Sequence, residues 1–144
     1  MARFKFQLEP VLLQRTAKEE AAEQALALAH NEYNNRCAVL QNTRQHLEQA
    51  LTRDEEKIDV FENMHLDFYR ASLSEKITAQ EEEVNYAANA VEHSRQSAVQ
   101  ARQERQAIEK LKEKHLQKHK LEEEAREQKM VDEMALYAHF RSTE

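Results

Sequence analysis

The stretch Asp54–Asp59 (DEEKID) decides how this chain folds, because it is the best candidate for the place where a long helix ends and the chain reverses. Asp59 can accept hydrogen bonds from the free N–H groups of a new helix, and Glu62 follows three residues later, as in an acidic version of the capping box. No Gly or Pro marks the reversal. The stretch predicts a helical hairpin with its turn at about 56–59.

Before this turn, residues at alternating spacings of three and four predict one helix over about 10–55. Pro10 suits its first turn, and residues 1–9 alternate between apolar and polar side chains, which predicts an extended arm. Two successive steps of four around Tyr33 predict a local unwinding of the supercoil. The predicted seam residues are Leu12, Arg15, Glu19, Ala22, Leu26, Ala29, Tyr33, Cys37, Leu40, Arg44, Leu47, Leu51, Asp54 and Ile58.

After the turn, a second stripe predicts a helix over about 60–140, with one five-residue step after Phe68. Beyond Leu111 the stripe fades, because residues 109–129 are mostly charged or polar, and apolar residues return only near Met130. The predicted seam residues are Phe61, His65, Phe68, Leu73, Ile77, Gln80, Val84, Ala87, Val91, Ser94, Ala98, Ala101, Arg105, Ile108 and Leu111.

Composition agrees with this fold class, an all-α, long two-helix antiparallel coiled coil in one domain over 1–144. The chain has no Gly, one Pro and 33% charged residues, and it is rich in strong helix formers. A first helix of about 68 Å, at about 1.5 Å per residue, would pair with residues of about 60–105. The second helix would therefore overhang, and we expect residues 106–140 to lack an intramolecular partner and to be ordered by another protein.

Charge and hydropathy exclude several classes of function. The net charge is −6 and the charges are interspersed, so we expect no basic face and no nucleic-acid binding. No apolar run approaches 18 residues, which predicts no membrane insertion. The first residues lack the apolar core of a signal peptide, and Cys37 has no second cysteine to pair with. These features indicate the cytoplasm.

The sequence offers little for catalysis. His115 and His119 share a helix face and could hold a metal, but no third ligand is evident, so we interpret them as surface histidines. Cys37 is interpreted as a small seam residue, and the clusters Glu81–Glu83 and Glu122–Glu124 as solvated faces. Without Gly, no phosphate-binding loop can form. We expect no enzymatic activity, no cofactor and no metal.

Two apolar patches remain as candidates for binding. Phe61, Phe68, Tyr69 and Leu73 follow the turn, and they either plug the end of the hairpin or form a docking patch. Met130, Met134 and Tyr137 form a soft patch near the other end, where docking is favoured because no intramolecular partner is expected to reach it.

Both ends of the chain resemble the flagellar export proteins of the FliJ family. The matching residues are Phe4–Leu12 (FKFQLEPVL) with Arg15 and Glu19-Glu20, and then Glu127–Ala135 (EQKMVDEMA). The length and the segment from Phe68-Tyr69 through Leu73 to Ile77 also fit, so the resemblance covers the whole chain. One departure is Lys57-Ile58-Asp59, where many relatives would have Gly in the turn.

The resemblance implies a stalk similar to that of rotary ATPases, peripheral to the inner membrane at the flagellar base and required for flagellar motility. It implies insertion into the hexamer of the export ATPase, coupling to the cytoplasmic domain of the export gate, and recycling of export chaperones. The gate contact would carry over to Phe68, Tyr69, Leu73 and Ile77, although Lys76 and Gln80 are poor hydrophobic anchors. The ATPase contact would fall on Met130, Asp132, Glu133, Met134 and Tyr137.

Two alternatives remain open from the sequence. One is the stalk of a non-flagellar type III secretion system, which would have the same fold. The other is a structural coiled coil that forms a homodimer or filament. That second alternative predicts one uninterrupted helix, and the fading stripe after Leu111 argues against it.

Overall fold

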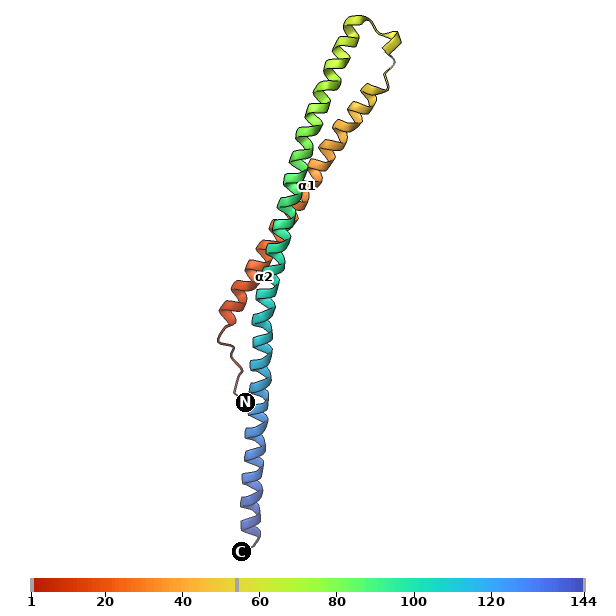
Figure 1. Ribbon diagram of the computed structural model, residues 1–144. Coiled ribbons are helices and arrows are strands. Elements are labelled where there is room, and N and C mark those ends of the chain that lie inside the picture. Colours follow the sequence, from red (N-terminus) through yellow and green to blue (C-terminus); the bar gives the residue numbers. More distant parts are fainter. Residues whose placement is uncertain (1, 54, 144) are drawn as a thin grey trace. The chain divides into compact units, whose positions relative to one another are not determined.

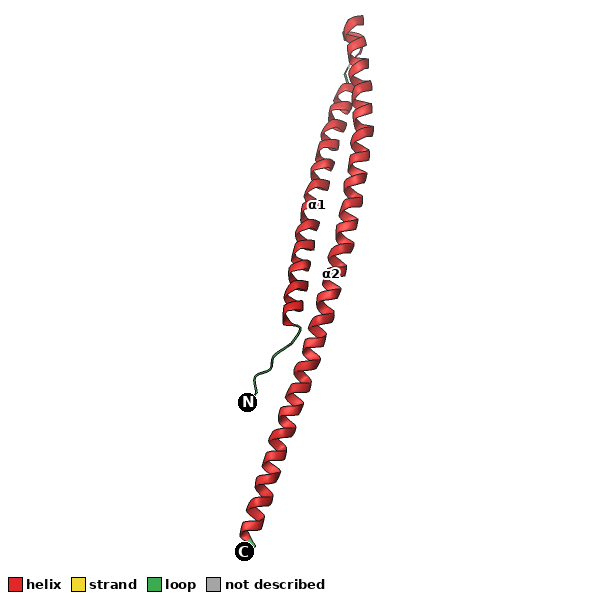
Figure 2. Ribbon diagram, turned by 90° about the vertical axis from the view of Figure 1, so that its left-hand side faces the viewer, coloured by secondary structure: helices red, strands yellow, loops and turns green. Residues whose placement is uncertain are grey.

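The computed structural model describes residues 2–53 and 55–143, which form two long helices and no strand (Figures 1 and 2). Helix α1 covers Glu9–Leu51, a single 3-10 turn covers Glu55–Lys57, and helix α2 covers Val60–Ser142. The helices pack against each other as a hairpin, which confirms the all-α two-helix coiled coil. Neither helix is apolar over a stretch long enough to cross a membrane.

The turn falls where the sequence places it, but α1 ends at Leu51 and not near residue 55. Asp59 lies immediately before α2, and its Oδ1 accepts a hydrogen bond from the N–H of Val60 at 2.8 Å. The carbonyl of Ala50 in the last turn of α1 accepts bonds from Arg70 of α2, at 2.7 Å from Nη2 and 3.1 Å from Nε. A guanidinium is a favourable partner at this position because the C-terminal carbonyls of a helix carry partial negative charge. Asp54 of the predicted turn lies outside the described residues.

The chain divides into two compact units. The central unit is Glu20–Gln100, and the terminal unit combines Met1–Glu19 with Ala101–Glu144. Whether residues 1–144 behave as one domain stays a prediction.

In the central unit, α1 and α2 lie side by side, and the predicted seam is confirmed over most of its length (Figures 1 and 2). The spacing of four from Tyr33 to Cys37 is present, and Leu40 is buried. Near the turn the predicted seam is wrong. Thr43 and Ala50 are buried in α1 where Arg44 and Leu51 were expected. In α2 the inward-facing residues are Asn63, Leu66 and Arg70, and not Phe61, His65 and Phe68.

This different register removes the five-residue step that the sequence analysis needed after Phe68. From Leu66 the seam runs to Arg70, Leu73 and Ile77 in steps of four, three and four. Leu66 and Leu73 form the core of the hairpin end with Ala50, and Leu47 and Ile58 pack against them. Small and aliphatic side chains let the helices approach closely, whereas two Phe rings in the seam would hold them apart.

Ion pairs join the two helices on both sides of the central seam. Arg36 Nη1 of α1 is 2.8 Å from Glu83 Oε2 of α2, and Arg44 Nη2 is 2.8 Å from Glu81 Oε1. Glu32, one turn earlier in α1, also accepts a bond from Arg36, and both carboxylates raise the pKa of that guanidinium. These exposed pairs fix register more than they add stability, because solvent screens them.

The terminal unit has a charged layer in its seam. Glu19 is only 8% exposed, and it accepts a hydrogen bond from Nε of Arg105. Arg102 Nε lies 3.5 Å from the same carboxylate, and Arg105 Nη1 reaches Glu109 at 2.6 Å. A carboxylate buried to this extent requires paired cations, because removing an unpaired charge from water costs on the order of several kcal/mol.

Candidate partner-binding surfaces

The structure separates the four residues predicted to contact the export gate. Phe68 is 72% exposed and Tyr69 is also exposed, so both side chains are available to a partner. Leu73 is 6% exposed in the core of the hairpin end, and Ile77 is half-buried in the same seam. Leu73 and Ile77 therefore hold the helices together in this structure, and a partner of the folded hairpin meets Phe68 and Tyr69.

Phe68 also belongs to an exposed stripe that includes Phe61, offered by the sequence as part of a docking patch, and Met64, which the sequence did not single out. Phe61, Met64 and Phe68 are all exposed and lie at spacings of three and four, so they share one face of α2. We call these three residues the tip stripe. Sequence reasoning placed Phe61 and Phe68 in the seam because they are the largest apolar residues available there. The better signal was the unbroken spacing that starts from Leu66.

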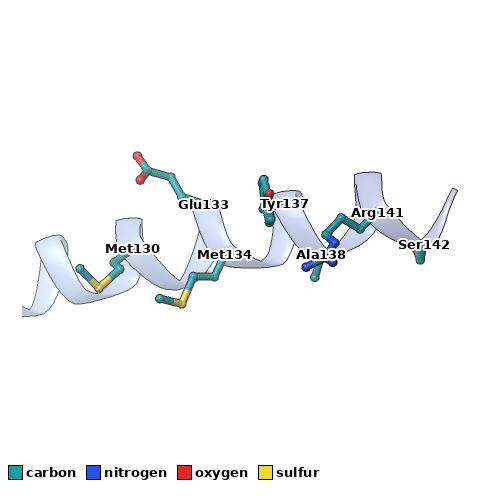
Figure 3. Close-up of a pocket in the computed structure, with 7 residues that line it drawn as sticks. All are labelled: Met130, Glu133, Met134, Tyr137, Ala138, Arg141 and Ser142. Carbon is teal, nitrogen blue, oxygen red and sulfur yellow. The ribbon is translucent and has the colours of Figure 1, made fainter. Parts of the chain in front are cut away.

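At the other end of α2, residues 124–143 are exposed on every side, and we call this segment the bare end. The side chains of Met130 and Met134 point to the same side of the helix (Figure 3). Tyr137 and Glu133 line the same shallow surface hollow. Asp132 lies about 200° round the helix from Met130, at about 100° per residue. Its Oδ1 accepts a bond from Gln128 at 3.0 Å. Of the five residues predicted to contact the ATPase, four therefore share one surface and Asp132 lies on another.

We call Met130, Met134 and Tyr137 the methionine stripe, and this stripe continues the face of α2 that packs in the seam. The inward residues Leu116, His119 and Glu123 are half-buried, and burial ends at Glu123. Met130 follows seven residues later, or two turns, and so lies on the same face. The bare end thus continues the packing face of α2 past Glu123, the last residue of that face that is half-buried.

The bare end is shorter than the sequence predicted, and the expectation that it begins at 106 is wrong. Glu9, the first residue of α1, is 2.8 Å from Lys112 Nζ. The arm then continues along α2, where the Phe4 ring meets the His119 ring with centroids 5.4 Å apart. The sequence predicted only that the arm is extended, because two isolated phenylalanines carry no signal of what they pack against.

The residues considered for metal or redox chemistry have other contacts. His115 meets the ring of Phe6, and His119 lies 4.0 Å from Glu123. The described residues contain no group of three or more His, Cys, Asp or Glu that could hold a metal ion. Cys37 is half-buried in the seam, and its hydrogen bond with Tyr33 raises the pKa of that phenol.

Comparison with known proteins agrees with this architecture. We found no match among curated proteins and none among solved structures. The family model described as "Flagellar FliJ protein" matches residues 4–144, which includes the arm, both helices and the bare end. This chain belongs to the FliJ family of flagellar proteins.

Proposed function

We propose that this chain is the coiled-coil stalk of the flagellar protein export apparatus, and that it joins the export ATPase ring to the cytoplasmic domain of the export gate. The observation that carries the proposal is the family match over residues 4–144 in a hairpin whose second helix extends past its partner. A role in recycling export chaperones belongs to the same proposal, without assigned residues. In this role the chain lies in the cytoplasm, at the inner face of the membrane.

The bare end is the surface that we assign to the ATPase. Its methionine stripe extends the packing face of α2. A partner can therefore bury these side chains in the way that α1 and the arm bury the earlier residues of the same face. Methionine is flexible and polarisable, which suits contacts with several similar subunits of a ring. Met130, Met134, Tyr137 and Glu133 carry the contact, and Asp132 meets a different part of the partner.

Removing the bare end tests this assignment. A chain ending at residue 123 keeps every residue of α2 that is at least half-buried among those described, so its fold should be retained. We expect it to lose co-purification with the cognate export ATPase and stimulation of ATP hydrolysis. A matched variant, Val131→Ser with Leu136→Ser, changes exposed apolar residues of the same segment outside the methionine stripe and should bind more tightly than Met130→Ser with Met134→Ser. Equal stimulation of ATP hydrolysis by the full and shortened chains would exclude the bare end as the ATPase contact.

The exposed side chains after the turn are the surface that we assign to the gate. Phe68 and Tyr69 are the accessible members, whereas Leu73 and Ile77 support them from the seam. Phe68→Ala with Tyr69→Ala should abolish capture by the cytoplasmic domain of the gate while circular dichroism stays unchanged. Tyr86→Ala, which alters an exposed aromatic residue farther along α2, is the control. Retained capture by the double variant would remove the gate contact from this surface.

The two alternatives are weakened by specific observations. The family model that matches is a flagellar one, which favours the flagellar apparatus over a non-flagellar secretion system. A homodimeric filament requires one uninterrupted helix, whereas the chain forms a hairpin with itself.

A further inference from the structure

Charge is distributed unequally between the two units. By sequence, the central unit has 15 Asp and Glu against 7 Lys and Arg, whereas the terminal unit has 12 against 14. Within the terminal unit, the segment 110–120 (KLKEKHLQKHK) has five Lys and two His against a single Glu. The chain as a whole is acidic, and this segment is a local exception that the net charge conceals.

The arm adds to this positive segment. Contacts of Phe4 with His119 and of Phe6 with His115 hold the arm against α2, and Lys112 Nζ lies 6.0 Å from the centre of the Phe6 ring. Arg3 and Lys5 flank these rings in sequence and are exposed. We call Arg3, Lys5 and the five lysines of 110–120 the basic collar.

Most of the collar is not neutralised within the chain. Lys112 is paired with Glu9 at 2.8 Å, and Lys118 lies 4.0 Å from Glu122. The other five collar residues form no ion pair with any residue in 2–53 or 55–143: Arg3, Lys5, Lys110, Lys114 and Lys120. Among the described residues outside the collar, most arginines have carboxylate partners. Uncompensated cations at this density repel one another, a cost that an acidic partner would remove.

We propose that the basic collar docks an acidic segment of the export ATPase, next to the contact made by the bare end. This inference rests on the proposed function and adds the chemistry of the partner surface. The collar ends at Lys120 and the bare end begins at residue 124, so one partner can cover both.

The placement of the lysines favours a partner that surrounds the helix. At about 100° per residue, Lys110, Lys114 and Lys118 lie on one side of α2. Lys112 lies on the side of the arm, and Lys120 lies between them. Because the arm and Glu9 already occupy the side of Lys112, a flat surface such as a membrane would meet either Lys120 or the other three lysines, whereas a ring of subunits can present acidic groups to both.

Association kinetics with the cognate export ATPase test the inference on the full-length chain. We expect the variant Lys110→Gln/Lys114→Gln/Lys118→Gln to associate about tenfold more slowly than the wild type at 50 mM NaCl, because complementary charge acts mainly on the association rate. The difference in association rate should shrink to about twofold or less at 500 mM NaCl, because the Debye length there is well below its value of about 10 Å at 0.1 M salt. The control Arg53→Gln/Lys57→Gln/Lys76→Gln removes the same charge from the central unit and should associate within about twofold of the wild type.

A second variant protects the test against a folding defect in the first. Arg3→Gln/Lys5→Gln changes only the arm, outside both helices, and should slow association in the same salt-dependent way. Wild-type rates in the collar variants, or equal slowing in the control, would overturn the inference and leave the proposed function standing. A wild-type chain that does not bind the ATPase would overturn both. Collar-dependent binding to duplex RNA that is tighter than binding to the ATPase would also overturn it, because the collar would then be a nucleic-acid surface.

Discussion

The ring of Phe6 meets the ring of His115 edge-on, with centroids 5.8 Å apart and the ring planes at 74°. Phe6 is only 6% exposed, although it precedes α1 and belongs to no regular element. The arm is therefore a packed part of the terminal unit that extends the seam beyond the first residue of α1. Edge-to-face geometry of this kind contributes about 0.5–1.5 kcal/mol beyond the burial of apolar area.

Phe6→Ala should release the arm without unfolding α1. Burial of one Phe contributes roughly 1.5–3 kcal/mol, and few other contacts hold the arm. We expect trypsin to cleave after Arg3 and Lys5 at least about tenfold faster in the variant, because cleavage tracks the population of the open state. Leu28→Ala, which changes an exposed residue of α1 in the central unit, should leave cleavage unchanged. Equal cleavage of wild type and Phe6→Ala would show that the ring does not hold the arm.

Gln80→Leu should stabilise the hairpin. Gln80 is 7% exposed in the seam, and its Oε1 has no hydrogen-bond partner among the described residues. Replacing an unsatisfied buried amide by an apolar side chain of similar volume removes a desolvation cost, so the free energy of unfolding should rise by about 1 kcal/mol. Urea denaturation measures this, with Gln49→Leu on the exposed side of α1 as the control. A loss of stability would show that the Gln80 amide is satisfied in solution.

Leu73→Ala should destabilise the hairpin, whereas Phe68→Ala should leave its stability almost unchanged. Leu73 lies in the core of the hairpin end, so its truncation should cost about 2–4 kcal/mol. Phe68 is exposed, and its truncation should change the free energy of unfolding by less than about 0.5 kcal/mol. Thermal and urea denaturation distinguish the two. A large loss in Phe68→Ala would place its ring in the core, as the sequence suggested.

Glu19 and Arg105 should show strong coupling in a double-mutant cycle. Glu19→Leu alone leaves the partly buried Arg105 with Glu109 as its carboxylate partner and removes the buried pair, and we expect it to cost about 2 kcal/mol. Glu19→Leu with Arg105→Leu should recover most of that loss, because a seam of apolar residues carries no desolvation cost. Additive losses in the double variant would mean that the two side chains act independently.

Glu92 should titrate below an ordinary glutamate. Two hydrogen bonds from Arg95, at 2.7 and 3.0 Å, lower the pKa of Glu92 from its ordinary 4.5. A lowered pKa gives a stabilising contribution that is present above pH 4.5 and is lost as the pH falls through the shifted value. NMR titration of Glu92 in the wild type and in Arg95→Gln measures this, and the variant should return to the ordinary value. An unchanged pKa in Arg95→Gln would assign the shift to another cause.

How far the exposed apolar surfaces could be predicted differs between the two ends of α2. The methionine stripe was recognised because Met130, Met134 and Tyr137 follow the mostly polar residues 109–129 at spacings of four and three. The tip stripe was predicted only in part: Phe61 and Phe68 fitted either the seam or a docking patch, because two faces of α2 satisfied a spacing of three and four, and Met64 was not named. Burial depends on which face the partner helix meets, and that is not a local property of α2.

The sequence by itself determined that the chain forms two helices that reverse in the fifties. These features follow from helix propensity, the absence of Gly and the spacing of apolar residues. All three are local properties of the chain, so they can be recognised without knowing what each helix packs against. Only the tertiary structure decided which residues enter the seam near the turn and how far α2 is covered. Leu66 and Leu73 fit between closely packed helices, and Phe4 and Phe6 find their partners more than a hundred residues away. The contacts of the arm leave no periodic trace because the arm is not helical, whereas the contacts between the two helices appear in both sequences as apolar stripes.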